Sequence, residues 1–280
     1  MLRKLFRYEF AASARSFLLA YAALLVLSAL FPVSLRVLSG SDGIAAFLAT
    51  SALVLLYIAV VTIIGVLTLA QIIGRFNSNL LGSQGYLMHT LPVTPVQHIL
   101  AKLLAALAQG VLSVIAGGAS LVILSFCFGG SEFFTEAWEA LMYYAHCVIG
   151  EFNAAYDMPF AVYAVMLVLL VVTEAIVLIL SIYASLSMGQ LINRHRILLS
   201  VGVFIGFRIV MSIITDLLSS AFGLVESSLG SVFVPIVSIL VGFDFNAVRW
   251  VLLSLAEQLI FAGVFFLLTS FLLKKHLNLE

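Results

Sequence analysis

Residues 160–190 read FAVYAVMLVLLVVTEAIVLILSIYASLSMGQ and carry one charged side chain, Glu174. A helix needs about 20 predominantly apolar residues to cross the hydrocarbon core of a bilayer, and this stretch is long enough to do so. Before and after this stretch in the chain, five further segments meet the same criterion: 17–38, 44–70, 99–125, 197–219 and 247–273. The sequence therefore predicts an all-α, polytopic membrane protein with six transmembrane helices.

The composition of the whole chain agrees with this class. Of the 280 residues, 64% are hydrophobic and 9% are charged, whereas a soluble domain carries about 25% charged residues. The stretch 231–243 is also apolar, but it is short and Pro235 interrupts it. We therefore interpret 220–246 as an exterior re-entrant or interface-lying element between the fifth and sixth spans. Residues 1–280 are expected to form a single transmembrane domain.

The distribution of lysine and arginine orients the six spans. Loops on the cytoplasmic side of a membrane carry an excess of these residues. The predicted exterior segments contain only Arg36 and Arg249, and the predicted cytoplasmic segments contain ten basic residues: Arg3, Lys4, Arg7, Arg15, Arg75, Lys102, Arg194, Arg196, Lys274 and Lys275. We therefore expect both termini in the cytoplasm.

Residues 1–16 predict an amphipathic helix that lies on the inner leaflet. Leu2, Leu5, Phe6 and Phe10 recur at three- to four-residue spacing, with basic residues between them. The start of the chain lacks the short apolar core and small-residue cleavage site of a signal peptide. We expect an interfacial helix here; a simple positively charged flank of the first span is the alternative.

The predicted exterior segment 126–159 contains five acidic residues and no lysine or arginine. Its apolar residues between 133 and 145 lie at helical spacing, which predicts an amphipathic helix on the outer leaflet. The segment is either an acidic vestibule that attracts cationic substrates or an ordinary solvated loop. Both cysteines, Cys127 and Cys147, fall in it, as free thiols or as a bonded pair.

A compact, glycine-bounded stretch, GSQGYLMHTLPV, occupies residues 82–93 between the second and third spans. The apolar cluster at 86–88 on a cytoplasmic loop suggests a partner surface, or else packing under the protein's own spans. Thr94 and Pro95 then predict the start of the next helix. The chain contains no Gly-x-x-x-x-Gly-Lys-Ser/Thr loop, so it does not bind ATP by that route.

Two stretches carry a family resemblance: MLRKLFRYEF at residues 1–10, and GSQGYLMHTLPVTPVQHILAKLL from residue 82. The first resembles the elbow helix, and the second the coupling element and third span, of ABC-2-type transporter permeases of Gram-positive bacteria. The order of amphipathic start, six spans and exterior re-entrant element is similar as well. Ser83 and Gln84 depart from the family, in which an acidic residue is frequent at this point.

The resemblance implies a permease subunit of an ATP-driven exporter in the bacterial cytoplasmic membrane. The chain would pair with a second permease copy or homologue and dock a separate ATPase subunit, which would bind ATP and magnesium. The cargo would be amphipathic or lipophilic, such as a peptide, a lipid or a drug. Nucleic acid would not be a partner. The expected ATPase contacts are Gly82, Gln84, Gly85, Tyr86, Leu87 and Met88.

Three ionisable residues lie well inside predicted spans: Glu174, Arg208 and Glu257. A charge at such a depth is costly in lipid, so each side chain is expected to face protein or water. The rise of a helix places them at similar depths, so an Arg208 pair with Glu174 or Glu257 is feasible. The pair would serve either to fix helix register or to contact substrate. Gly202 and Gly206, four residues apart, predict close helix packing.

Two other classes of function stay open. An ion-coupled secondary transporter would use Glu174 or Glu257 for protons, and a non-transporting subunit would sense or scaffold. An intramembrane enzyme is not expected, since no His-Glu-x-x-His motif is present. No catalytic or metal-binding residue is expected either, because the histidines lie at span ends or in loops: His89, His98, His146, His195 and His276.

Overall fold

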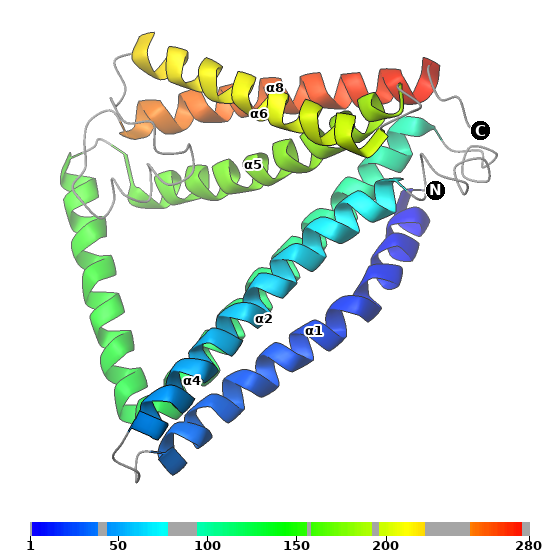
Figure 1. Ribbon diagram of the computed structural model, residues 1–280. Coiled ribbons are helices and arrows are strands. Elements are labelled where there is room, and N and C mark those ends of the chain that lie inside the picture. The colour runs from blue at the N-terminus through cyan, green and yellow to red at the C-terminus, as the bar shows by residue number, and fades with distance from the viewer. Residues whose placement is uncertain are drawn as a thin grey trace. The chain divides into compact units, whose positions relative to one another are not determined.

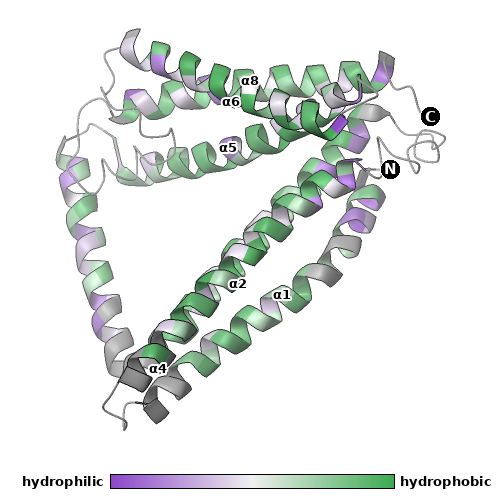
Figure 2. Cartoon of the chain, viewed as in Figure 1, coloured by the Kyte–Doolittle hydropathy of each residue, from purple (hydrophilic) through white to green (hydrophobic). Residues whose placement is uncertain are grey.

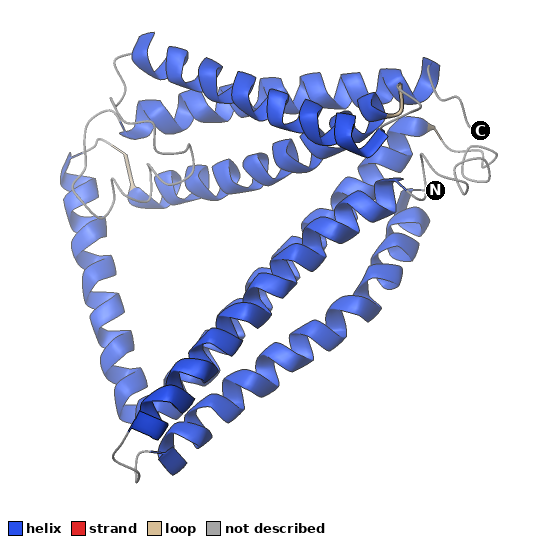
Figure 3. Cartoon of the chain, viewed as in Figure 1, coloured by secondary structure: helices blue, strands red, loops and turns tan. Residues whose placement is uncertain are grey.

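The computed structural model describes residues 2–38, 44–77, 94–155, 158–191, 196–221 and 247–275. The elements within these ranges are α-helices (Figure 3), which confirms the predicted all-α class. In chain order (Figure 1) they are α1 (Leu2–Leu38), α2 (Ile44–Phe76), α4 (Pro95–Ala155), α5 (Phe160–Gly189), α6 (Arg196–Ala221) and α8 (Ala247–Lys275).

Five helices in the described part of the chain are long and apolar enough to cross a membrane: Val54–Phe76, Val96–Leu124, Phe160–Gly189, Arg196–Ser220 and Val248–Lys274. Figure 2 shows the hydrophobic residues running along them. The chain is thus a multi-span helical membrane protein. The predicted first span, 17–38, lies in α1, within which Phe17–Phe31 is an apolar helical segment. A sixth crossing stays a prediction.

Two boundaries differ from the sequence prediction. The predicted interfacial helix and first span are one helix, α1, and the predicted third span and exterior amphipathic helix are one helix, α4. Gly129 and Gly130 do not end α4, because a glycine costs only about 1 kcal/mol in a helix interior and no proline follows to break the hydrogen bonding. The 61 residues of α4 span about 90 Å, far more than the hydrocarbon core requires.

The chain divides into two compact units. The first contains Met1–Gly74 and Leu100–Met142, and so α1, most of α2 and the middle of α4. The second contains Arg75–Ile99 and Tyr143–Glu280, and so α5, α6, α8 and the ends of α4. In the first unit Phe17, Leu24 and Phe31 are buried at seven-residue intervals, which gives α1 one apolar packing stripe.

In the second unit α5 packs along α8 and α6, and α6 meets α8 over a shorter stretch. Near the start of α5, Phe152, Tyr163, Leu170, Trp250 and Val251 form a buried apolar cluster. Asn153 anchors this end, because its Oδ1 accepts a 2.8 Å hydrogen bond from the Phe160 N–H, a donor left without a helical partner in the first turn.

The opposite end of α5 is more crowded. Seven consecutive residues, 179–185, are buried, so the helix is covered on every side here, since 3.6 residues complete a turn. The Tyr183 ring stacks on Phe76, the last residue of α2, with ring centroids 4.2 Å apart. At Gly189, an added Cβ would meet the Ser200 side chain and lie 2.7 Å from the Arg196 carbonyl oxygen of α6. The two tightly packed ends hold the middle of α5 against α6 and α8.

A polar cluster between α5, α6 and α8

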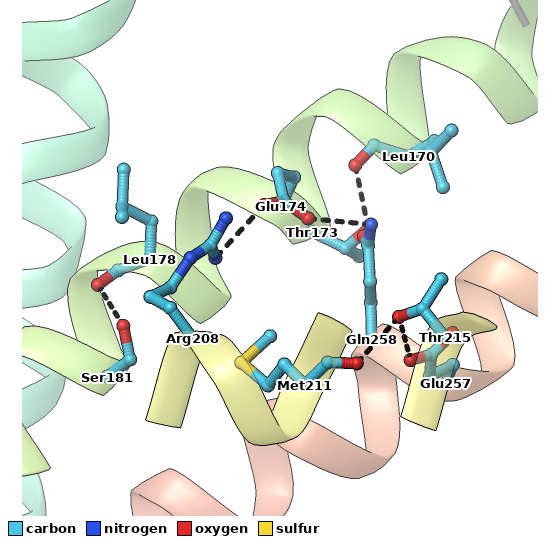
Figure 4. Close-up of polar contacts among 10 residues, drawn as sticks. All are labelled: Leu170, Thr173, Glu174, Leu178, Ser181, Arg208, Met211, Thr215, Glu257 and Gln258. Carbon is cyan, nitrogen blue, oxygen red and sulfur yellow. Dashed lines mark hydrogen bonds and ion pairs between the residues drawn. The ribbon is translucent and has the colours of Figure 1, made fainter. Parts of the chain in front are cut away.

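The three ionisable residues predicted at depth come together in the second unit. Arg208 on α6 points its Nη1 at Oε1 of Glu174 on α5, 3.5 Å away (Figure 4). Of the two pairings that the sequence left open, the structure forms the one with Glu174. Glu257, on α8, instead lies beside Thr215 of α6.

Two neutral residues that the sequence analysis did not single out complete the Glu174 site. Gln258 Nε2 donates a 2.8 Å hydrogen bond to Glu174 Oε2. The hydroxyl of Thr173, one residue before Glu174, lies 2.5 Å from Gln258 Oε1. Both Glu174 oxygens therefore have a partner, one cationic and one neutral. A glutamine next to Glu257 within an apolar helix was the available sequence signal, because buried amides need hydrogen-bond partners.

Glu257 has a simpler environment. Its Oε1 lies 2.6 Å from Thr215 Oγ1, and the same hydroxyl oxygen lies 3.0 Å from the Met211 carbonyl oxygen one turn earlier in α6. A threonine in a helix commonly donates to such a carbonyl. Glu257 and Gln258 are neighbours on α8 but contact different helices, since adjacent residues on a helix diverge by about 100°.

Exposure separates the members of this cluster. Glu257 is 8% exposed, whereas the Glu174 and Arg208 side chains are 20% and 42% exposed. Arg208 lies about 18 Å along α6 from Arg196, which is near the middle of a span. The guanidinium is thus a partly uncovered charge at a depth where lipid solvates charges poorly.

A second set of polar contacts joins the helices of the first unit. Lys102 Nζ of α4 lies 2.7 Å from Glu9 Oε1 of α1, and both residues are buried. Further along, Tyr21 of α1 contacts Ser113 and Gln109 of α4, and Tyr57 of α2 lies 2.8 Å from Ser120 of α4.

The Glu9–Lys102 pair was not predicted, because Lys102 has the position of a basic residue that orients a span toward the cytoplasm. Glu9 was the available signal, since it is the only acidic residue among the first 41 and lies within the predicted apolar face of the N-terminal helix.

The remaining predicted site residues have different outcomes. The expected coupling residues 82–88 and the expected re-entrant element, from residue 222 to 246, lie outside the described residues. A Cβ at Gly202 or Gly206 would meet no atom within 4 Å, so these glycines make no close helix contact within the described part of this chain.

Cys147 is a free, exposed cysteine. The residues described contain no cluster of three metal-ligating side chains.

These features define a multi-span helical membrane protein with a charged cluster inside one unit and a buried ion pair inside the other. Comparison of the chain with protein-family models, with curated proteins and with solved structures returns no match.

Proposed function

We propose that this chain is the permease subunit of an ATP-driven ABC exporter in a bacterial cytoplasmic membrane. It works as a dimer, with a second copy or a homologue, and moves an amphipathic or lipophilic cargo outward. A separate ATPase subunit binds ATP and magnesium and docks on residues 82–93. The observation that carries a transport role is the half-exposed Arg208 in the middle of α6.

A guanidinium at this depth is stable only where water or protein replaces lipid. Its one ion pair among the described residues, with Glu174, covers one side of the group at 3.5 Å and leaves 42% of the side chain accessible. A pathway through the membrane, or the facing surface of a second subunit, would supply the missing polar surroundings. Both are properties of a permease dimer.

The Glu9–Lys102 pair supports the ATP-driven form of this proposal. Lys102 lies in the second turn of α4, which begins at Pro95, directly after the proposed docking residues 82–93. The buried 2.7 Å contact joins this part of α4 to the N-terminal segment of α1. A push on the docking residues would therefore reach α1 as well as α4.

The test is copurification of the tagged chain with an ATPase subunit from mild detergent. Replacing Tyr86, Leu87 and Met88 together with serine should abolish copurification and leave the thermal stability of the spans unchanged. The matched control replaces Tyr143 and Tyr144, exposed aromatic residues of α4 in the predicted exterior segment, with serine. Recovery of the chain without any ATPase subunit in several mild detergents would overturn the proposal.

An ion-coupled secondary transporter is the second candidate, favoured by one observation. Among the residues that the structure describes, the cluster between α5, α6 and α8 contains two carboxyl residues and one arginine. Uptake into vesicles that is driven by a proton gradient without ATP, and lost in Glu174→Gln or Glu257→Gln, would support this candidate. Transport that requires an active ATPase, and stops with a catalytically dead one, would exclude it together with a purely sensing role.

A further inference from the structure

The polar cluster of the second unit has one more carboxyl group than it has cations. Arg208 and Gln258 both contact Glu174, at 3.5 and 2.8 Å. Glu257 has one polar partner among the described residues, the Thr215 hydroxyl at 2.6 Å. Arg208 thus pairs with Glu174, and a negative charge on Glu257 would have no counter-ion among the residues that the structure describes.

The other charged residues of the same helices do not lie beside Glu257 or have the wrong sign; Lys274 and Lys275, at the end of α8, are about 26 Å further along its axis. Asp216 follows Thr215 on α6, but it is exposed and negative. Arg249 belongs to α8 itself and lies eight residues before Glu257, about 12 Å along the axis. Arg196 begins α6, about 28 Å along the helix from Thr215.

Burial makes an ionised Glu257 costly. The residue is 8% exposed within the chain itself, so little of its surface is open to solvation by water. A carboxylate removed from water without a counter-ion costs many kcal/mol, and such a group takes up a proton instead. Glu174 differs, because it has a cation on one oxygen and an amide donor on the other.

The hydrogen bonds around Thr215 fit a protonated Glu257. Thr215 has one hydroxyl proton but lies near two oxygen atoms, Glu257 Oε1 at 2.6 Å and the Met211 carbonyl at 3.0 Å. When Glu257 is ionised, one of these contacts lacks a proton. When Glu257 is protonated, it donates to Thr215 Oγ1 and Thr215 donates to Met211, so both contacts are hydrogen bonds (Figure 4).

We propose that Glu257 is a proton-binding site inside the membrane span. Its side chain is a neutral carboxylic acid at neutral pH, and its proton lies in the hydrogen bond to Thr215. The neighbouring Glu174 is the member of the cluster that pairs with Arg208. This assignment does not depend on whether the chain serves an ATPase or an ion gradient.

Infrared spectroscopy of the full chain in lipid bilayers at neutral pH tests the assignment, because protonated carboxylic acids and ionised carboxylates absorb in separate regions. The difference between wild type and Glu257→Gln should show the loss of one carbonyl band of a protonated acid. The matched control, Glu174→Gln, should keep that band. Loss of carboxylate absorption in Glu257→Gln would overturn the proposal.

A second pair of variants keeps both carboxyl groups and covers the case in which Glu257→Gln does not fold. Thr215→Val removes the hydroxyl at nearly constant volume. The carboxylic acid of Glu257 would then lose its hydrogen-bond acceptor, and its carbonyl band should shift to the frequency of an acid without that hydrogen bond. Thr215→Ser retains a hydroxyl and should leave the band near its wild-type position. An acid band that Thr215→Val does not move would overturn the assignment.

Discussion

The buried ion pair between Glu9 and Lys102 allows a quantitative prediction. The two charged atoms are 2.7 Å apart, and the side chains are 9% and 4% exposed. Removing one partner of a buried pair costs about 3–5 kcal/mol, because the remaining charge has lost its counter-ion, whereas an exposed pair contributes about 0–1 kcal/mol. We expect Glu9→Gln to lower the free energy of unfolding by about 3 kcal/mol, the lower end of that range, since Glu9 retains slight exposure.

Denaturant titration in detergent micelles, followed by circular dichroism, measures this difference. Arg3→Gln is the matched control, because Arg3 is exposed on the same helix and its loss should change stability by less than about 0.5 kcal/mol. The double variant Glu9→Gln/Lys102→Met should recover most of the loss, since removing both partners leaves no buried charge. If Glu9→Gln costs no more than Arg3→Gln, the pair does not fix α1 to α4, and the mechanical link proposed between them fails.

Three further predictions concern the second unit. Gly189→Ala should cost about 1–3 kcal/mol in thermal or denaturant unfolding, because its Cβ would lie 2.7 Å from a backbone oxygen of α6; Gly202→Ala, with open space around it, should be neutral. Asn153→Ala should cost about 1 kcal/mol in the same assay, since the Phe160 N–H loses its acceptor; equal stability would show that water replaces it. Arg208→Cys, in a chain with both native cysteines replaced by serine, should react with a water-soluble thiol reagent in intact membranes. Leu217→Cys, at another exposed position of α6, serves as the comparison. If the cysteine at 208 does not react, that side chain faces lipid or protein rather than a water-filled pathway.

The sequence predicted the charged members of the polar cluster and left open whether Arg208 pairs with Glu174 or Glu257; the structure forms the pair with Glu174. Ionisable residues stand out within apolar stretches, and helical rise gives their depth. Thr173, Thr215 and Gln258 were not foreseen, because hydroxyl and amide side chains are frequent in membrane helices and their partners depend on how the helices rotate about their axes. That rotation is set by packing between distant segments, such as the contact of Gly189 with α6.

The same limits explain the helix boundaries. The predicted third span ends at residue 125, but α4 continues through Gly129 and Gly130, because a glycine costs only about 1 kcal/mol in a helix interior and no proline interrupts the hydrogen bonding. The Glu9–Lys102 contact was not predicted for a different reason. A lysine near the end of a span already has an explanation in membrane orientation, so composition alone did not indicate that it had a buried partner 93 residues away.

The crowded end of α5 has a consequence for amide-proton exchange in the second unit. Residues 179–185 touch protein on every side, so neither lipid chains nor detergent molecules contribute to their surroundings. Amide protons there should exchange with solvent only when the second unit comes apart, and their exchange should be indifferent to bilayer thickness. The less buried helices α2 and α6, by contrast, should exchange at rates that depend on the membrane in which the protein is placed. Within the second unit, this short length of helix is therefore the reference point against which movement of the other helices can be measured.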